Sequence, residues 1–560
     1  MGFARLLAFT LLLIALPIVF AASDEIKPKK TGMAIADIGL KWNIDLQDQR
    51  VSELKIKTFG FSNYPSQQVI SEATDPYTAA VMDGLKNKIR EFTLNPGLNY
   101  QSFSMDSKVK VQFTFDFPPA TDASNYLAES DYVKITPEIK QKAEQISASQ
   151  ITDMDRAVAI AQWVHNNLRY DRNYINLVRS SDEAYIERAG TCDEFSHLFI
   201  AMLRSIGIPA KFSASYVYSG TDWGAHAFVE AAIGGKWIPF DPTFNEAILL
   251  DATHIKFGEG ADQSDIKEDI SIRSSDADVS RVRLLREFDL QFKETQNFPE
   301  LFAMELILPE KEIGEGSIET VSVRLKNKEH RLAIPLSLLT PKDLQIVGEN
   351  KVSEDKLVLL EPFEERDVVW KIVFPKLEEG YDYKFPVVVE SLGQDANGTI
   401  RASRDGQVNE KEDLLVTGIS AAEREDTLAL SFTLKNTGNV DTTGVITLKV
   451  QGIPEEEKRF ALMAGKDMQV SFLVRKIEPE KVLIGNLLIE TGSLTVTQPF
   501  EFSLAASGQP SVGEPVSSLQ PTEVPIGGIV PGLPNEYLLL VGAILLVLAA
   551  FFVRAGIRYD

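Results

Sequence analysis

The stretch "GTCDEFSHLFIAMLRSIGIPA", residues 190–210, decides how the middle of this chain folds. Its apolar side chains recur at the spacing of a buried helix, and Gly207 and Pro209 end that pattern. Cys192, the only cysteine in 560 residues, stands at the first turn of this helix and off its apolar stripe. Because the N-terminal end of a helix favours negative charge, the position predicts a thiol with a lowered pKa. The alternative is an inert thiol that packs as a small apolar side chain.

A second stretch, "WGAHAFVEAAIGGKWIPFDPT" (223–243), supplies the partners that a nucleophilic cysteine needs. The two glycines at 234–235 form a favoured turn, so the stretch reads as two antiparallel strands of one hairpin. The register that this turn sets places His226 and Asp241 on one face, as diagonal neighbours whose side chains can reach each other. The hairpin is therefore predicted to present an imidazole together with a carboxylate.

We predict a catalytic triad of Cys192, His226 and Asp241. In this arrangement His226 takes the thiol proton through Nε2, and Asp241 holds the ring through Nδ1. Trp223, three residues before His226, is a candidate substrate-binding residue that shields the site from water, or else a core tryptophan. His197, on the helix of the nucleophile but off its face, is expected to take no part. The alternatives are a core histidine with a turn aspartate, or a zinc site made by the three triad residues.

The order of these elements resembles the transglutaminase-like superfamily, whose fold is of the papain type. The resemblance spans about residues 130–262 and rests on Gly190-x-Cys192 at a helix start, the following "GIPA", His226 on a strand, and the run from Trp237 to Asp241-Pro-Thr243. It implies a core of helices with an antiparallel sheet, and catalytic roles for the three predicted triad residues. It also implies attack on a carboxamide or peptide bond through a thioester, in a prokaryotic or archaeal-type membrane-anchored member.

Two positions separate this chain from the cross-linking members of the superfamily. Asp193 follows the cysteine where animal cross-linking enzymes carry tryptophan, and Phe228 replaces the tryptophan usual after the histidine. We therefore predict a hydrolytic thiol enzyme, a protease or amidase, in preference to an acyltransferase. The alternative is a non-enzymatic surface protein that binds a partner through β-sandwich domains. The sequence contains no EF-hand calcium loop, and we predict no metal and no cofactor.

Strand-like alternation on both sides of this region predicts a multidomain α+β protein. A faint repeat, "VSVRLKN" (321–327) and "LSFTLKN" (430–436), indicates two tandem β-sandwiches of the Ig-like type. A second pair, "DVVWKIVF" (367–374) and "DMQVSFLV" (467–474), has a similar offset. The predicted boundaries are 24–125 for a β-rich N-terminal domain, 126–265 for the catalytic domain, and 285–395 and 396–505 for the two sandwiches.

The ends of the chain and its charge bear on location and partners. Residues 1–21 read as a signal peptide, 506–534 as a Pro/Gly/Ser linker, 535–553 as a transmembrane helix and 554–560 as a cytoplasmic tail. These features predict a single-pass type I membrane protein, with its catalytic domain outside the cytoplasm and a protein or peptide substrate at the cell surface. The formal net charge of −23 argues against nucleic-acid partners, because phosphates repel an acidic protein.

Overall fold

The computed structural model describes residues 31–503 except 48–52, 95–97, 176, 274–281, 349–351, 425–426, 451–453 and 476–481. The predicted signal peptide, linker, transmembrane helix and tail lie outside the described residues. Within the described ranges, no helix is both long and apolar enough to cross a membrane. The chain divides into two compact units, 1–411 and 412–560.

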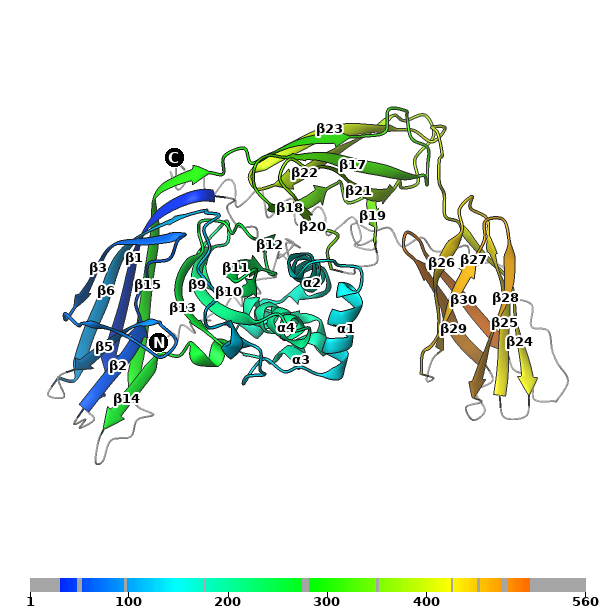
Figure 1. The fold of residues 1–560 in the computed structure, drawn as a ribbon. Coiled ribbons are helices and arrows are strands. Elements are labelled where there is room, and N and C mark those ends of the chain that lie inside the picture. Colours follow the sequence, from blue (N-terminus) through cyan, green and yellow to red (C-terminus); the bar gives the residue numbers. More distant parts are fainter. Residues whose placement is uncertain are drawn as a thin grey trace, which may run out of the picture. The chain divides into compact units, whose positions relative to one another are not determined.

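Two four-stranded antiparallel sheets form an N-terminal β-sandwich in the first unit (Figure 1). One sheet has the order β15 (Arg283–Asn297), β1 (Thr31–Asp45), β6 (Tyr100–Gln112), β3 (Gln67–Asp75). The other has the order β14 (Asp269–Arg273), β2 (Glu53–Phe59), β5 (Lys88–Leu94), β4 (Ala80–Met82). Alternate apolar residues fill the space between the sheets, where Trp42 stacks on Phe103 with ring centroids 4.8 Å apart.

Two strands of this sandwich come from the far side of the catalytic region. β15 pairs with β1 from Thr31↔Asn297 to Asp45↔Arg283, and β14 pairs with β2. The sequence-based boundary that started a separate sandwich at residue 285 is corrected here, because this strand completes the N-terminal sheet. The predicted catalytic domain is therefore an insertion between β6 and β14.

The core of the predicted catalytic domain is a five-stranded antiparallel sheet with helices packed against it (Figure 1). The strand order is β12 (Glu246–Ala247), β11 (Lys236–Asp241), β10 (Trp223–Ile233), β9 (Ala210–Tyr218), β13 (Ile255–Gly260). The helices are α1 (Pro137–Ser147), α2 (Asp153–Asn167), α3 (Ser181–Glu187) and α4 (Cys192–Ser205), with short parallel strands β7 (Arg169–Tyr170) and β8 (Ala189–Gly190) beside them. The predicted turn is confirmed, because Ile233 pairs with Lys236 across the two glycines.

Local sequence explains where the core helices begin and end. α2 starts at a reciprocal cap in which Thr152 and Asp155 each bond the other's backbone N–H. α4 stops before Gly207, whose φ of +86° ends a right-handed helix without strain. α4 is buried on every side, including its polar residues Glu194 and His197, so it forms the centre of the core.

A second β-sandwich follows in the same unit and docks on α2. Its sheets have the orders β16 (Phe302–Ile307), β17 (Ile318–Asn327), β21 (Glu365–Val373), β19 (Gln345–Val347), and β20 (Lys356–Leu360), β18 (Leu332–Leu339), β22 (Tyr383–Ser391), β23 (Gln394–Ala402). The α2 side chain of Asn166 donates to the Asp355 carbonyl at 2.9 Å, which ties the two parts together. The predicted boundary at 395/396 cuts through β23 and is corrected, since β22 and β23 form one hairpin from Tyr383↔Ala402 to Ser391↔Gln394.

The second unit is one further β-sandwich. Its sheets have the orders β24 (Leu414–Arg424), β25 (Thr427–Asn436), β28 (Asp467–Arg475), and β27 (Glu456–Leu462), β26 (Thr442–Val450), β29 (Val482–Thr491), β30 (Thr495–Ser503). The repeated sequences fall on equivalent neighbouring strands, β17 with β21 and β25 with β28. The asparagine that ends each copy is buried and donates to backbone carbonyls of the adjoining turns, Asn327 to Glu361 at 2.7 Å and Asn436 to Val440 at 2.8 Å.

Candidate active site

A capping arrangement places Cys192 at the first residue of α4. The Glu194 carboxylate folds back and accepts hydrogen bonds from the Thr191 N–H at 2.6 Å and the Thr191 hydroxyl at 2.9 Å. Its other oxygen accepts from the Arg179 N–H at 2.9 Å. A Cβ at Gly190 would lie 2.4 Å from the Cβ of Glu194, so only glycine leaves room for this cap. The motif "GTCDE" thus fixes the position of the thiol.

The thiol itself is buried against the central strand of the sheet. Cys192 is 8% exposed, and its sulfur accepts a hydrogen bond from the N–H of Ala227, the residue after His226. Burial first, and the neighbouring charge of Asp193 second, raise the pKa of this thiol well above its ordinary value. The expectation of a lowered pKa is therefore wrong for the resting site, because burial outweighs the helix end. At neutral pH the group is a neutral thiol.

His226 and Asp241 meet as the hairpin register predicts, but through the other ring nitrogen. His226 Nε2 lies 2.7 Å from Asp241 Oδ2, and both side chains are buried. Asp241 Oδ1 accepts the N–H groups of Thr243 at 2.8 Å and Phe244 at 3.2 Å, which fixes the carboxylate. The Phe244 ring stacks on His226 with centroids 4.8 Å apart. Since Nε2 is taken by Asp241, Nδ1 is the nitrogen left for the Cys192 proton, a correction to the predicted roles.

A third residue, His254, completes the group and was missed by sequence reasoning. Its Nε2 lies 3.0 Å from the same Asp241 Oδ2, and its Nδ1 lies 2.8 Å from the Asp251 carbonyl oxygen. Neither acceptor carries a proton, so both ring nitrogens must donate and His254 is an imidazolium. Burial alone would lower the pKa of His254, but the hydrogen bond and charge of Asp241 outweigh burial and raise it to about 8. His254 stands in "DATHI", which carries no catalytic signature.

The two histidines keep Asp241 ionised. Burial would raise the pKa of this carboxyl, yet His226 and His254 hold it well below its ordinary value. The three side chains offer ligand atoms within 4.8 Å of one another, a donor set that zinc accepts. These atoms already bond one another, with Asp241 Oδ2 as the shared acceptor, so the geometry is that of a hydrogen-bonded chain.

Two other residues singled out from the sequence lie away from this group. Trp223 and His226 are three apart on β10 and so point to opposite faces. Trp223 packs against Phe292 with centroids 4.7 Å apart, in the N-terminal sandwich. His197 is fully buried, donates from Nδ1 to the Arg179 carbonyl at 3.0 Å, and has its pKa lowered to about 4 by burial.

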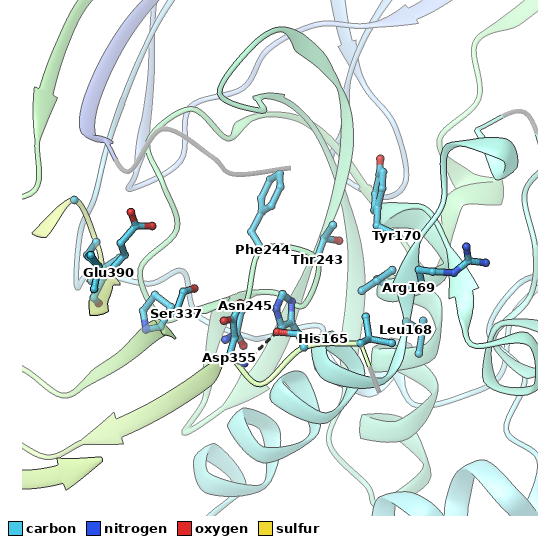
Figure 2. A pocket seen from close by; sticks show the side chains of 18 of the residues that line it. His165, Leu168, Arg169, Tyr170, Thr243, Phe244, Asn245, Ser337, Asp355 and Glu390 are labelled. Atoms are coloured by element: carbon cyan, nitrogen blue, oxygen red, sulfur yellow. Dashed lines mark hydrogen bonds and ion pairs between the residues drawn. The ribbon is translucent and has the colours of Figure 1, made fainter. Parts of the chain in front are cut away.

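A cavity of about 910 Å³ opens beside the triad, between the core and the second sandwich (Figure 2). Phe244, which stacks on His226, forms part of its wall. Tyr170 forms another part, next to the nucleophile, because β7 pairs Tyr170 with Gly190. In Figure 2, Ser337 and Glu390 of the sandwich face Tyr170 of the core across this space.

The chain carries a transglutaminase-like core. Residues 140–242 match the family model of the transglutaminase-like superfamily, which confirms the resemblance found in the sequence. The described structure is accordingly an α+β, β-rich protein built around that core.

Individual relatives share only parts of the chain. "Uncharacterized protein ML0607" of Mycobacterium leprae is 30% identical over 117 residues, which are 20% of this chain and 41% of that protein. "Uncharacterized protein YebA" of Bacillus subtilis is 23% identical over 167 residues, 26% of this chain and 22% of that protein. The chain thus spans less than half of either relative. Among solved structures, a "Putative Cysteine Protease from Cytophaga hutchinsonii" is 21% identical with a TM-score of 0.38, over 48% of this chain and 93% of that chain.

Proposed function

We propose that this protein is a membrane-anchored, extracytoplasmic thiol hydrolase that cleaves carboxamide or peptide bonds through a Cys192 thioester. The observation that carries the proposal is the placement of three groups. The Cys192 sulfur accepts the N–H that follows His226, and His226 is held by Asp241 at 2.7 Å. A nucleophile beside a base that a third residue orients is the arrangement that acyl transfer requires.

Cys192 is a neutral thiol in the resting site, so its proton must be transferred as the sulfur attacks the substrate. His226 Nδ1 takes the thiol proton as the Cys192 sulfur bonds to the substrate carbonyl carbon, and the carbonyl oxygen becomes an oxyanion. The N–H groups of the first turn of α4, which have no partners within the helix, stabilise that oxyanion. His226 then gives its proton to the leaving nitrogen, the C–N bond breaks, and an amine departs. Cys192 is left as a thioester.

Asp241 and His254 let His226 exchange its proton inside a buried site. A buried carboxylate that had only His226 as partner would favour a permanent imidazolium there, because an unpaired buried charge is strongly unfavourable. The His254 imidazolium pairs with Asp241 independently of the proton on His226. Asp241 can thus orient the base and stabilise its charged form without trapping it in that form. His254 is a positioning residue in this account.

Water resolves the thioester in the proposed reaction. His226 removes a proton from water, the oxygen attacks the thioester carbon, and the sulfur leaves with that proton to restore the thiol. The two positions that differ from cross-linking members support hydrolysis. Asp193 adds negative charge beside the nucleophile, and the Phe228 ring packs edge-on against His254 with centroids 5.8 Å apart. Phe228 therefore packs, inside the core, against the histidine that pairs with Asp241.

A labelled amine distinguishes hydrolysis from transfer. The full chain is incubated with glutamine-containing surface proteins and a fluorescent primary amine, and products are identified by mass spectrometry. Hydrolysis predicts peptide fragments or glutamine converted to glutamate, with no label incorporated, and no product from Cys192→Ala. Incorporation of the amine in place of hydrolysis would overturn the hydrolytic assignment.

The proposed location has its own test. The sequence patterns at 1–21 and 535–553 support an anchored protein with its catalytic core outside the membrane. Protease added to intact cells should then digest the catalytic core. Full protection of the core in intact cells, with digestion after lysis, would contradict the proposed location.

A further inference from the structure

The short strands β7 and β8 hold Tyr170 beside the first turn of α4. Tyr170 pairs with Gly190 in a parallel register, and the N–H of Asp171 donates to the Gly190 carbonyl at 2.9 Å. Residues that pair across two strands point their side chains to the same face. A Cβ at Gly190 would lie 2.4 Å from the Cβ of Glu194, so this face is turned toward the start of α4. The Tyr170 side chain therefore projects toward the turn that carries Cys192.

The surroundings of the Tyr170 ring agree with this direction. The ring lies against Phe195, one turn after Cys192 on α4, with centroids 6.3 Å apart. Burial first, and the charge of Cys192 second, raise the pKa of Tyr170 well above its ordinary value. Asp193 and Glu194, on the same turn, raise that pKa further. The hydroxyl thus lies at the first turn of α4 and keeps its proton at neutral pH, so it is a hydrogen-bond donor.

The Tyr170 hydroxyl is available to a bound molecule. No residue in the part of the chain that the structure describes is its hydrogen-bond partner, and its oxygen is not enclosed by the protein. The side chain is half-buried and lines the cavity of about 910 Å³. Figure 2 shows Tyr170 and Phe244 extending in the same direction from the cavity wall, and Phe244 stacks on His226. One of these aromatic side chains therefore adjoins the turn of the nucleophile, and the other adjoins the base.

We propose that the Tyr170 hydroxyl is a catalytic donor, which stabilises the oxyanion formed when Cys192 attacks a carbonyl carbon. The inference rests on the proposed function and adds a residue to its site. In the attack the thiol proton passes to His226, the sulfur–carbon bond forms, and one electron pair of the C=O bond moves to the oxygen. The Tyr170 O–H donates a hydrogen bond to that oxygen and keeps its proton, beside the N–H groups at the start of α4. When the amine leaves and the C=O bond is restored, the hydroxyl is unchanged.

Tyr170→Phe removes the hydroxyl and keeps the ring that contacts Phe195. In hydrolysis of a glutamine-containing peptide, kcat should fall by about 10²-fold, because the bond is made in the transition state. KM should change by less than about twofold, since the substrate carbonyl carries no full charge before attack. Tyr185→Phe, at a half-buried tyrosine of α3 that does not line the cavity, is the matched control and should keep both constants. The rate at which iodoacetamide alkylates Cys192 should be equal in Tyr170→Phe and wild type, because alkylation forms no oxyanion.

Binding of a tetrahedral adduct tests the donor without turnover. Two acetylated tetrapeptides are made with a ¹³C-labelled aldehyde, one at the C-terminus and one in place of a glutamine side-chain carboxamide. The Cys192 sulfur bonds to the aldehyde carbon and the thiol proton is transferred to the oxygen, which gives a hemithioacetal visible by ¹³C NMR. The aldehyde that reacts with the wild type should bind at least about tenfold more weakly to Tyr170→Phe, because the adduct resembles the transition state. The matching primary alcohol, which forms no adduct, should bind both proteins equally.

The outcomes separate this role from the proposed function. Failure of both aldehydes to form an adduct with wild-type Cys192 would contradict the thiol hydrolase itself. An adduct of equal affinity in the two proteins, or an unchanged kcat in Tyr170→Phe, would leave the hydrolase standing and overturn the role of Tyr170. Faster alkylation together with faster hydrolysis in Tyr170→Phe would also overturn it, because the hydroxyl would then restrain the resting thiol.

Discussion

Asp241 accepts a hydrogen bond from His254 at 3.0 Å through Oδ2, the same oxygen that holds His226 at 2.7 Å. A single buried oxygen thus accepts hydrogen bonds from two rings; in the proposed reaction His226 exchanges a proton while His254 stays charged. The Asp241 carboxylate therefore orients His226, while the positive charge of His254 balances its negative charge. The consequences for substitution and for pH can be measured.

Replacement of Asp241 by asparagine should be severe. If the amide oxygen takes the place of Oδ2, the NH₂ group faces the N–H donors of Thr243 and Phe244, and if the amide is turned round, the NH₂ group faces both rings. In either case the charge that stabilises the His226 imidazolium is lost. We expect kcat/KM to fall by about 10³–10⁴-fold with the fold retained, as judged by circular dichroism. Asp382→Asn, at an exposed position, is the matched control and should keep full activity. An Asp241→Asn enzyme with a tenth or more of the wild-type rate would contradict the orienting role.

The charge on His254 should make stability depend on pH. Its folded pKa of about 8 exceeds the ordinary value of 6.5, so the stabilisation is fully present below pH 6.5 and is lost as pH rises through 8. The free energy of unfolding should fall by about 2 kcal/mol across that window, because each pKa unit corresponds to about 1.4 kcal/mol. Urea unfolding followed by tryptophan fluorescence at several pH values measures it.

The comparison that isolates His254 is a pair of identical substitutions. His254→Gln should lack the fall in stability that the wild type shows through pH 8, whereas His330→Gln, at an exposed histidine, should retain it. If the His254→Gln and wild-type profiles run parallel, the assignment of a buried imidazolium is wrong.

The Cys192 thiol should react slowly with alkylating reagents in the resting protein. Because burial and Asp193 raise its pKa, iodoacetamide labelling should reach its midpoint above the free-cysteine value of about 8.5. Asp193→Asn should lower that midpoint, since it removes the nearest like charge. The pKa of Asp193 is itself raised to about 7 by burial, so the variant should differ from wild type only above that pH. A wild-type midpoint below that of free cysteine would contradict the raised pKa and support a Cys192 thiolate that exists before substrate binds.

Gly190→Ala tests whether the cap at the start of α4 holds the site. The added Cβ would lie 2.4 Å from Glu194, so the carboxylate must leave Thr191 and the first turn must shift. A loss of about 2–4 kcal/mol in stability is expected, together with a loss of activity beyond the unfolded fraction. Gly84→Ala has open space around the added Cβ and serves as the control. Unchanged activity in a folded Gly190→Ala protein would show that the cap is not needed.

Features set by local spacing could be predicted from the sequence. The start of α4 at Cys192, the two-glycine hairpin that brings His226 to Asp241, and the repeated strands that end at Asn327 and Asn436 all depend on nearby residues. Their physical determinants, a cap, a turn and an alternating pattern, are visible within about twenty residues of chain.

Features that depend on contacts between distant parts of the chain could not be predicted from the sequence. β15 joins β1 across more than two hundred residues, and His254 reaches Asp241 only because the chain turns back after β12. The choice of Nε2 over Nδ1 at His226 depends on how the ring stacks on Phe244, which a register alone does not define. The helix start at Cys192 is visible in the sequence, whereas the burial that raises the pKa of its thiol is not.

The central claim is a thioester on Cys192, and rapid-quench mass spectrometry tests it most directly. The full chain is mixed with a glutamine-containing peptide, quenched in acid within the first turnover, digested and mapped. The account predicts an acyl adduct on the peptide that contains Cys192, released by hydroxylamine, and absent from Cys192→Ala. Product formation by Cys192→Ala, or an adduct carried by any other residue, would contradict it.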